Sequence, residues 1–132
     1  MRYMLDTNIC IYAIKHRPPS VIAALRSHAA AGIGVSSITV AELYFGAYKS
    51  ASTKNLTALQ HFLSPLEIAD FDSAAADVYG RVRLELECAG RPIGPLDTQI
   101  AAHALALDVT LVTHNTRECV RVSGLRVEDW VV

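Results

Sequence analysis

Met1-Arg2-Tyr3-Met4-Leu5-Asp6-Thr7-Asn8 is the stretch from which the rest of the chain can be placed. Its apolar segment, residues 3–5, predicts a short buried strand bounded by polar residues. Asp6 falls where that strand ends, the next two residues favour a turn, and the apolar run 9–14 predicts a helix start. An acid at the carboxyl end of a first strand faces the crevice where open α/β sheets bind ligands. On this stretch alone, Asp6 could equally be only the cap of the following helix.

Composition limits the class of protein. The 132 residues fit one domain, residues 1–132, and 52% hydrophobic with 19% charged residues indicates a compact fold rather than disorder. The surplus of apolar residues is compatible with a partner interface or with a rich core. A net charge of −1 argues against a strongly basic nucleic-acid coat but leaves room for a local basic rim.

Cysteine usage and hydropathy predict a cytoplasmic location. The three cysteines, Cys10, Cys88 and Cys119, are widely spaced and form no CxxC pair, so we expect reduced thiols in or near the core. The N-terminus lacks an apolar run typical of a signal peptide, and no later segment is expected to span or bind a membrane.

Strand and helix patterns alternate along the chain, with connections long enough for parallel pairing. This predicts a three-layer α/β/α sandwich around a central, mostly parallel sheet. Further strands are expected after the loop at 32–34, at 66–69, at 109–113 and at 127–131; further helices are expected at about 19–30, 39–48, 52–63, 73–88 and 98–107.

Polar residues from distant segments fall at one edge of this predicted sheet. Asp6 ends the first strand, Glu42 lies one turn into the helix after the second, and Asn115 lies just beyond the fourth. The post-strand ends of parallel strands share one edge, and Asp97 can reach it from a helix start. Carboxylates gathered there would raise one another's pKa, a conflict that a hard divalent cation removes. Such a site could hydrolyse a phosphodiester by in-line displacement.

Each of these residues also has a purely structural interpretation. Thr39-x-x-Glu42 matches a capping box, and Asp97 could be the N-cap of the 98–107 helix. Asn115 could be only a turn residue, and we interpret Asp72, another acid after a strand, as a helix cap.

The whole pattern resembles the PIN-domain ribonucleases, and closely the VapC toxins of bacterial toxin–antitoxin pairs, in their enteric branch. The resemblance covers essentially the whole chain. It is carried by five stretches: Met4–Asn8, Ser37–Leu43, Gly90–Asp97 with the following Ile100-Ala101, Val112–Glu118, and Gly124–Trp130.

The resemblance implies roles for individual residues. Asp6, Glu42 and Asp97 take the places of the three invariant acids, which act in catalysis and hold Mg²⁺ or Mn²⁺. Asn115 takes the fourth catalytic place, which is Asp in many relatives. Residues implied to contact the substrate or to orient the acids are Thr7, Asn8, Arg91, Thr113, Arg117 and Glu118.

The activity implied by the resemblance is metal-dependent endonuclease cleavage of RNA, with the anticodon loop of initiator tRNA as the expected substrate. The implied partners are a homodimer mate and a small VapB-type antitoxin, whose tail lies in an apolar groove and blocks the acids. A larger toxin–antitoxin assembly would contact operator DNA only through the antitoxin. The helix segment Leu43-Tyr44-Phe45 with Tyr48 could line either interface, or half of these residues could belong to the core.

Two other functions remain open at this point. The first is a phosphatase that uses Asp6 as its nucleophile, as in haloacid-dehalogenase-like enzymes. Those enzymes need a second acid two residues later, where this chain has Asn8. The second is a non-catalytic PIN module that only binds RNA or an antitoxin.

Overall fold

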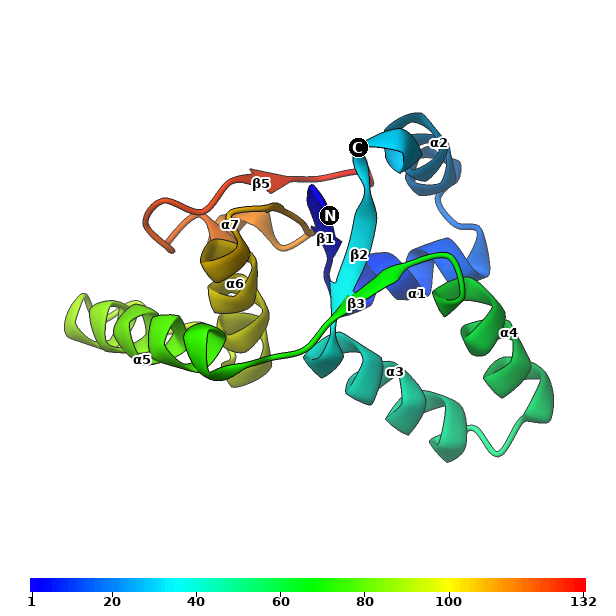
Figure 1. Ribbon diagram of the computed structural model, residues 1–132, viewed down its shortest axis with the longest axis horizontal. Helices are drawn as coiled ribbons and strands as arrows, with labels where there is room; N and C mark the ends of the chain where they lie inside the picture. The colour runs from blue at the N-terminus through cyan, green and yellow to red at the C-terminus, as the bar shows by residue number, and fades with distance from the viewer.

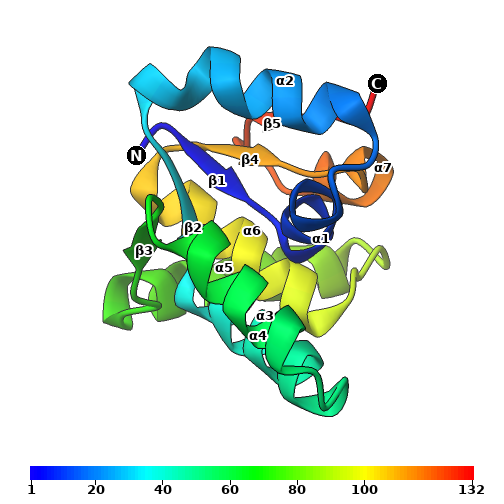
Figure 2. The ribbon, with the colours of Figure 1, turned by 90° about the vertical axis from the view of Figure 1, so that its right-hand side faces the viewer.

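A computed structural model describes all 132 residues. Its sheet has five strands in the order β3-β2-β1-β4-β5, and every neighbouring pair is parallel. The strands are β1 (Tyr3–Leu5), β2 (Ile33–Ser36), β3 (Glu67–Ala69), β4 (Thr110–Val112) and β5 (Val127–Glu128). Figure 2 shows β1 between β2 and β4, at the centre of the sheet.

Helices cover both faces of the sheet, which confirms the predicted three-layer sandwich (Figure 1). On one side lie α1 (Thr7–Lys15), α2 (Pro19–His28), α3 (Ser37–Lys49) and α4 (Thr53–Leu63), with a 3₁₀ turn (Ala29–Ala31) after α2; on the other lie α5 (Ser73–Cys88), α6 (Pro95–Leu107) and the short α7 (Thr116–Cys119). Adjacent residues of β1 point to opposite faces, so Leu5 belongs to the core under the first group and Met4 to the core under the second. Both are fully buried, as expected for a central parallel strand.

Three helix starts differ from the predictions. The two residues after Asp6 form the first turn of α1 instead of a separate turn. Helix α3 begins at Ser37, because the buried Ser36 caps it by accepting a hydrogen bond from the Ile38 N–H (3.1 Å). Thr39 therefore lies inside the helix and the capping-box interpretation of Glu42 is wrong. Helix α6 begins at Pro95, a favoured first residue, so Asp97 lies within its first turn and is not its N-cap.

Smaller differences concern ends and pairings. Residues 116–119 form the short helix α7, which was not among the predicted helices, and the last strand ends at Glu128 instead of continuing to residue 131. On the outer face of α5, Arg81 pairs with Asp77 (2.9 Å) and Arg83 pairs with Glu87 (2.7 Å). Cys88 is exposed, contrary to the expectation of a near-core thiol. The Asp72 cap is confirmed.

Candidate active site

The register of the sheet brings three strand ends to one edge. Leu5 pairs with Val112, and Val112 pairs with Glu128. The next residue of each strand, Asp6, Thr113 and Asp129, therefore emerges at the carboxyl edge, where parallel sheets bind ligands.

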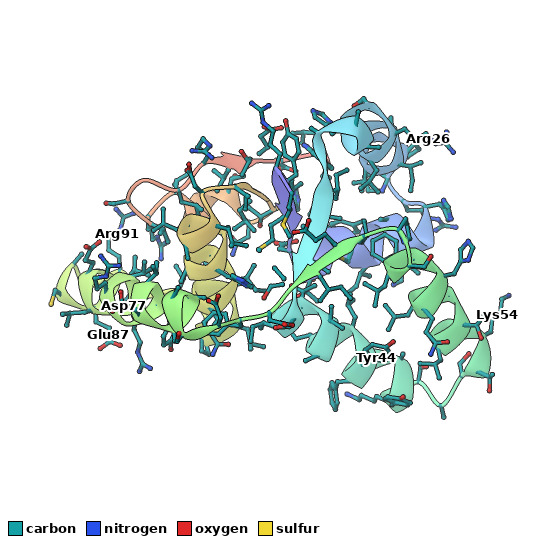
Figure 3. All side chains as sticks on the ribbon, in the orientation of Figure 1. Arg26, Tyr44, Lys54, Asp77, Glu87 and Arg91 are labelled. Atoms are coloured by element: carbon teal, nitrogen blue, oxygen red, sulfur yellow. The ribbon has the colours of Figure 1, made fainter.

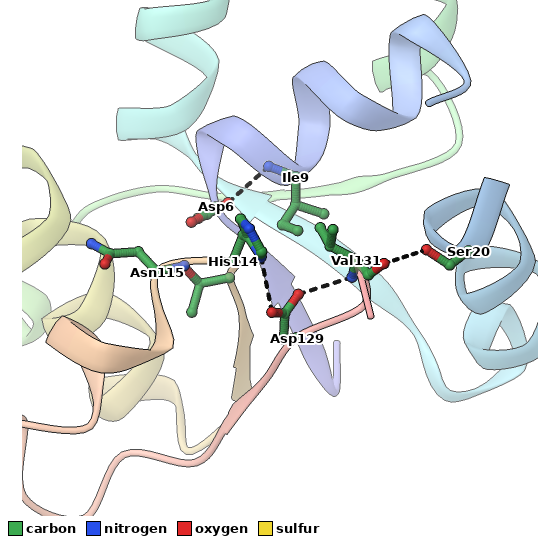
Figure 4. Close-up of polar contacts among 8 residues, drawn as sticks. Asp6, Ile9, Ser20, His114, Asn115, Asp129 and Val131 are labelled. Atoms are coloured by element: carbon green, nitrogen blue, oxygen red, sulfur yellow. Dashed lines mark hydrogen bonds and ion pairs between the residues drawn. The ribbon is translucent and has the colours of Figure 1, made fainter. Parts of the chain in front are cut away.

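Asp6 is held tightly at this edge and is only 7% exposed. Its Oδ1 accepts a hydrogen bond from the Ile9 N–H (2.9 Å), so it does cap α1 (Figure 4). Burial raises the pKa of the Asp6 carboxyl, and the charges of Asp97 and Asp129 raise it further, against the lowering effect of the Thr113 hydroxyl and the Ile9 amide. Asp6 therefore caps α1, but a capping role does not explain why Asp97 and Asp129 lie close enough to raise its pKa.

Asp97 approaches Asp6 from the first turn of α6 and is half-buried. Burial raises the pKa of its carboxyl, and the nearby charge of Glu118 raises it again, while the Asn115 amide lowers it. The Asn115 Nδ2 also donates to Glu118 Oε2 (2.7 Å). Asn115 thus contributes an amide between two carboxylates, and Glu118 from α7 is part of the acidic group.

Glu42 is held separately, on α3. Its Oε1 accepts a hydrogen bond from the Thr7 hydroxyl (2.7 Å), which ties the first residue of α1 to α3. Thr7 therefore orients Glu42, one of the acids that the resemblance places in the site. The charge of Asp97 raises the pKa of Asp6, and the charge of Glu118 raises the pKa of Asp97, whereas Glu42 is joined to this edge through Thr7, the residue after Asp6.

The remaining predicted contact residues divide by burial. Thr113 is fully buried and its Oγ1 accepts from the Asn115 N–H (2.9 Å), so it positions its neighbours instead of touching a substrate. Asn8, Arg91 and Arg117 are exposed. Arg91 lies on the loop between α5 and α6 (Figure 3), and neither arginine forms an ion pair with the acids.

Two residues near Asp6 were missed by the sequence reasoning. Asp129 follows β5 and contacts His114, whose Nδ1 lies 2.9 Å from Asp129 Oδ2 (Figure 4). Residues that follow parallel strands share one edge of the sheet, which is the rule that identified Asp6 and Asn115. The predicted last strand extended to residue 131, so Asp129 lay inside it and was not recognised as a residue that follows a strand.

The donor set suits a hard divalent cation. The charge of Asp97 raises the pKa of Asp6, and the charge of Glu118 raises the pKa of Asp97. No lysine, arginine or histidine forms an ion pair with any of these three acids. Carboxylate and amide oxygens are the ligands that Mg²⁺ and Mn²⁺ prefer. No three Asp, Glu, His or Cys side chains lie close enough to form a complete cage by themselves. A bound ion would therefore take its remaining ligands from water and from a substrate phosphate, as Mg²⁺ commonly does.

Comparison with known proteins gives one consistent result. The PIN domain model matches residues 3–125. Two relatives named tRNA(fMet)-specific endonuclease VapC, from Shigella flexneri and Salmonella typhimurium, are 45% and 42% identical over 131 residues, and each alignment covers 98% of both chains.

Solved structures agree with the sequence relatives. VapBC2 from Rickettsia felis, bound to a DNA fragment from its promoter, superposes with a TM-score of 0.90 at 44% identity, covering 98% of this chain and 99% of that one. DNA-bound VapBC from Salmonella typhimurium gives a TM-score of 0.90 at 41% identity and covers 98% of both chains.

None of the helices of this chain combines the length and apolarity needed to cross a bilayer.

Proposed function

The chain belongs to the PIN-domain family and, within it, to the VapC nucleases, and from that membership we propose that it is a Mg²⁺- or Mn²⁺-dependent endoribonuclease that cleaves initiator tRNA in its anticodon loop. As the toxin of a toxin–antitoxin pair, it would be silenced by a VapB-type antitoxin. The observation that carries the proposal is the group of acids at the carboxyl edge of β1 and β4, in which the charge of Asp97 raises the pKa of Asp6 and no acid has a cationic partner in the chain.

The chain's own residues determine what this edge does. Because the Ile9 amide and the Thr113 hydroxyl fix the Asp6 carboxylate, it cannot turn away from Asp97 to escape repulsion. Asn115 holds Glu118 beside Asp97, and Thr7, the residue after Asp6, holds Glu42. A bound Mg²⁺ would supply the positive charge that relieves this repulsion and stabilises the developing charge on the phosphate. The acids would then orient a water for in-line attack, forming one P–O bond as the bond to the leaving ribose oxygen breaks.

An unpaired loop suits this edge better than a duplex. Bases in a loop can be splayed out, which frees the backbone to approach the acids, and single-stranded loops are the usual targets of sequence-specific RNA recognition. Arg91 and Arg117 are exposed and near the acids in sequence, so they are the candidates for contacts with flanking phosphates.

An apolar groove beside Glu42 fits the tail of an antitoxin. Its volume is about 300 Å³, and it runs between α1, α3 and α4, with Thr7 and Glu42 among its lining residues. Apolar anchors of a bound peptide would contact Ile11, Ile14, Leu43 and Leu59. Outside the groove, Phe45 and Tyr48 are 68% and 66% exposed on α3, an apolar surface suited to a second protomer.

Cleavage of tRNA tests the proposed function. Protein freed from its antitoxin is incubated with total tRNA in Mg²⁺ or in EDTA, beside an Asp97→Asn variant, and the ends of the fragments are mapped. We expect discrete fragments of initiator tRNA that need Mg²⁺ and disappear with the variant. Fragments that persist in EDTA would exclude the metal-dependent reaction, and intact tRNA under every condition would leave only a binding module.

A further inference from the structure

His114 and Asp129 form a hydrogen-bonded pair near Asp6, whose pKa the charge of Asp129 raises. Asp129 Oδ2 lies 2.9 Å from His114 Nδ1, and Asp129 Oδ1 accepts from the Val131 N–H (2.9 Å). The Val131 carbonyl in turn accepts from the Ser20 hydroxyl (2.8 Å) on α2. Figure 4 shows this chain of contacts running from α2 to His114, beside Asp6. Both carboxylate oxygens of Asp129 are thus engaged, so the carboxylate holds the ring in one orientation.

The pairing determines which ring atom is available. A carboxylate only accepts hydrogen bonds, so Nδ1 carries the proton and points at Asp129. In the neutral ring, Nε2 is then an acceptor. The His114 side chain is 49% exposed, whereas that of Asp129 is 16% exposed. On its other side the ring meets Tyr12 edge-on, with centroids 6.3 Å apart, which limits tilting.

The surroundings determine what Nε2 can bind. The ring directly follows Thr113, whose hydroxyl contacts Asp6, and the charge of Asp129 reaches Asp6. Because Nε2 of the neutral ring accepts a hydrogen bond, its partner must be a donor, which an ionised phosphate oxygen is not. The neutral donor that an RNA backbone presents at each nucleotide is the ribose 2′-hydroxyl.

We propose that His114 is a substrate-contact residue, and that its Nε2 accepts a hydrogen bond from the 2′-hydroxyl of a nucleotide next to the scissile phosphate. The proposal rests on the proposed endoribonuclease activity and adds a reason for the preference for RNA over DNA. Asp129 is the positioning residue that directs the ring.

Paired changes in protein and substrate test this contact. The substrate is a synthetic anticodon stem-loop of initiator tRNA in which single loop nucleotides are replaced, one at a time, by their 2′-deoxy forms. The variant is His114→Phe, which keeps an aromatic ring against Tyr12 and removes both nitrogens. With the wild type, we expect one deoxy position beside the cut to lower kcat/KM by about fivefold to tenfold, the effect of one hydrogen bond. His114→Phe should show the same loss on the all-ribose loop and no further loss at that position.

Controls separate this contact from folding and from the activity itself. His61→Phe, an exposed histidine on α4, should behave as the wild type. His114→Asn, which can still donate to Asp129 but has no atom at the Nε2 position, should reproduce the effect of His114→Phe if both variants unfold at the wild-type temperature. The proposal would be overturned if the kcat/KM losses from His114→Phe and from a deoxy sugar were additive at every loop position. It would also be overturned if the His114→Phe loss were non-additive with a neutral methylphosphonate linkage instead of with a deoxy sugar. A wild type that cleaves the stem-loop in Mg²⁺ keeps the proposed function intact in either case.

Discussion

Replacing Thr7 with Val tests whether Glu42 works only when Thr7 holds it. The hydroxyl of Thr7 donates to Glu42 Oε1 at 2.7 Å, across 35 residues of sequence, and joins the helix that begins beside Asp6 to α3. Valine keeps the branched shape at the first position of α1 and removes only the donor. Glu42 would then be free to swing into the open groove that it lines.

The magnitudes follow from the partial burial of this pair. A hydrogen bond to a charged acceptor contributes about 1.5–3 kcal/mol when buried, and exposure reduces this to on the order of 1 kcal/mol. For a domain of this size, the melting temperature should fall by roughly 4 °C. A displaced catalytic group costs more in rate than in stability, so kcat/KM should fall by between about tenfold and 100-fold.

The assay compares Thr7→Val with Thr7→Ser, which restores the hydroxyl. Cleavage of the initiator tRNA stem-loop in saturating Mg²⁺ gives kcat/KM, and thermal unfolding in EDTA gives the stability difference. Thr7→Ser should keep most of the activity. If Thr7→Val cleaved as fast as Thr7→Ser, then Glu42 would need no anchor or would have no role, and the reasoning would fail.

Three further predictions concern the acids, the α3 cap and the thiols. In EDTA at pH 7, Asp97→Asn should unfold at a higher temperature than the wild type. The folded pKa of Asp97 lies above its ordinary value of 3.8, so the wild type loses stability as the pH rises from 3.8 through the folded pKa, and the two proteins should have similar stabilities at lower pH. A difference in unfolding temperature that does not change with pH would contradict this prediction. Ser36→Ala removes a fully buried hydroxyl that is hydrogen-bonded to the Ile38 N–H and to His103 Nδ1 (2.8 Å). The free energy of unfolding in urea should fall by about 2 kcal/mol. A fall of less than about 0.5 kcal/mol would refute this prediction. Of the three thiols, only the exposed Cys88 should react with a thiol reagent in the native protein, since burial raises the pKa of Cys10 and raises that of Cys119 to about 12; fast labelling of either would show that the core opens.

The layers and the sheet edge could be predicted because they depend on local patterns. Short apolar runs alternating with amphipathic helices fix a parallel sheet, and a parallel sheet brings its post-strand residues to one edge. That rule was enough to place Asp6 and Asn115. It failed at Asp129 because β5 pairs with one neighbour through only two residues and ends before its apolar pattern does.

The long-range contacts could not be predicted from local patterns. Ser36, Ser37 and Thr39 are all favourable caps in sequence, and only the burial of Ser36 against His103 selects it as the α3 cap. The bond from Thr7 to Glu42 depends on how α1 packs against α3, which no spacing encodes. Local patterns therefore identify the acids, whereas tertiary packing determines which residue orients each of them.

Binding of Mn²⁺, measured by electron paramagnetic resonance in place of Mg²⁺, tests the central claim that the acids at this edge form one metal site. The wild type, Asp97→Asn and, as a control, Asp77→Asn on the outer face of α5 are titrated with and without a stem-loop that carries an uncleavable linkage. We predict weak binding by the wild type alone, tighter binding when the substrate phosphate is present, loss of both with Asp97→Asn, and no change with Asp77→Asn. Binding that is equally strong in the wild type and Asp97→Asn would contradict the claim.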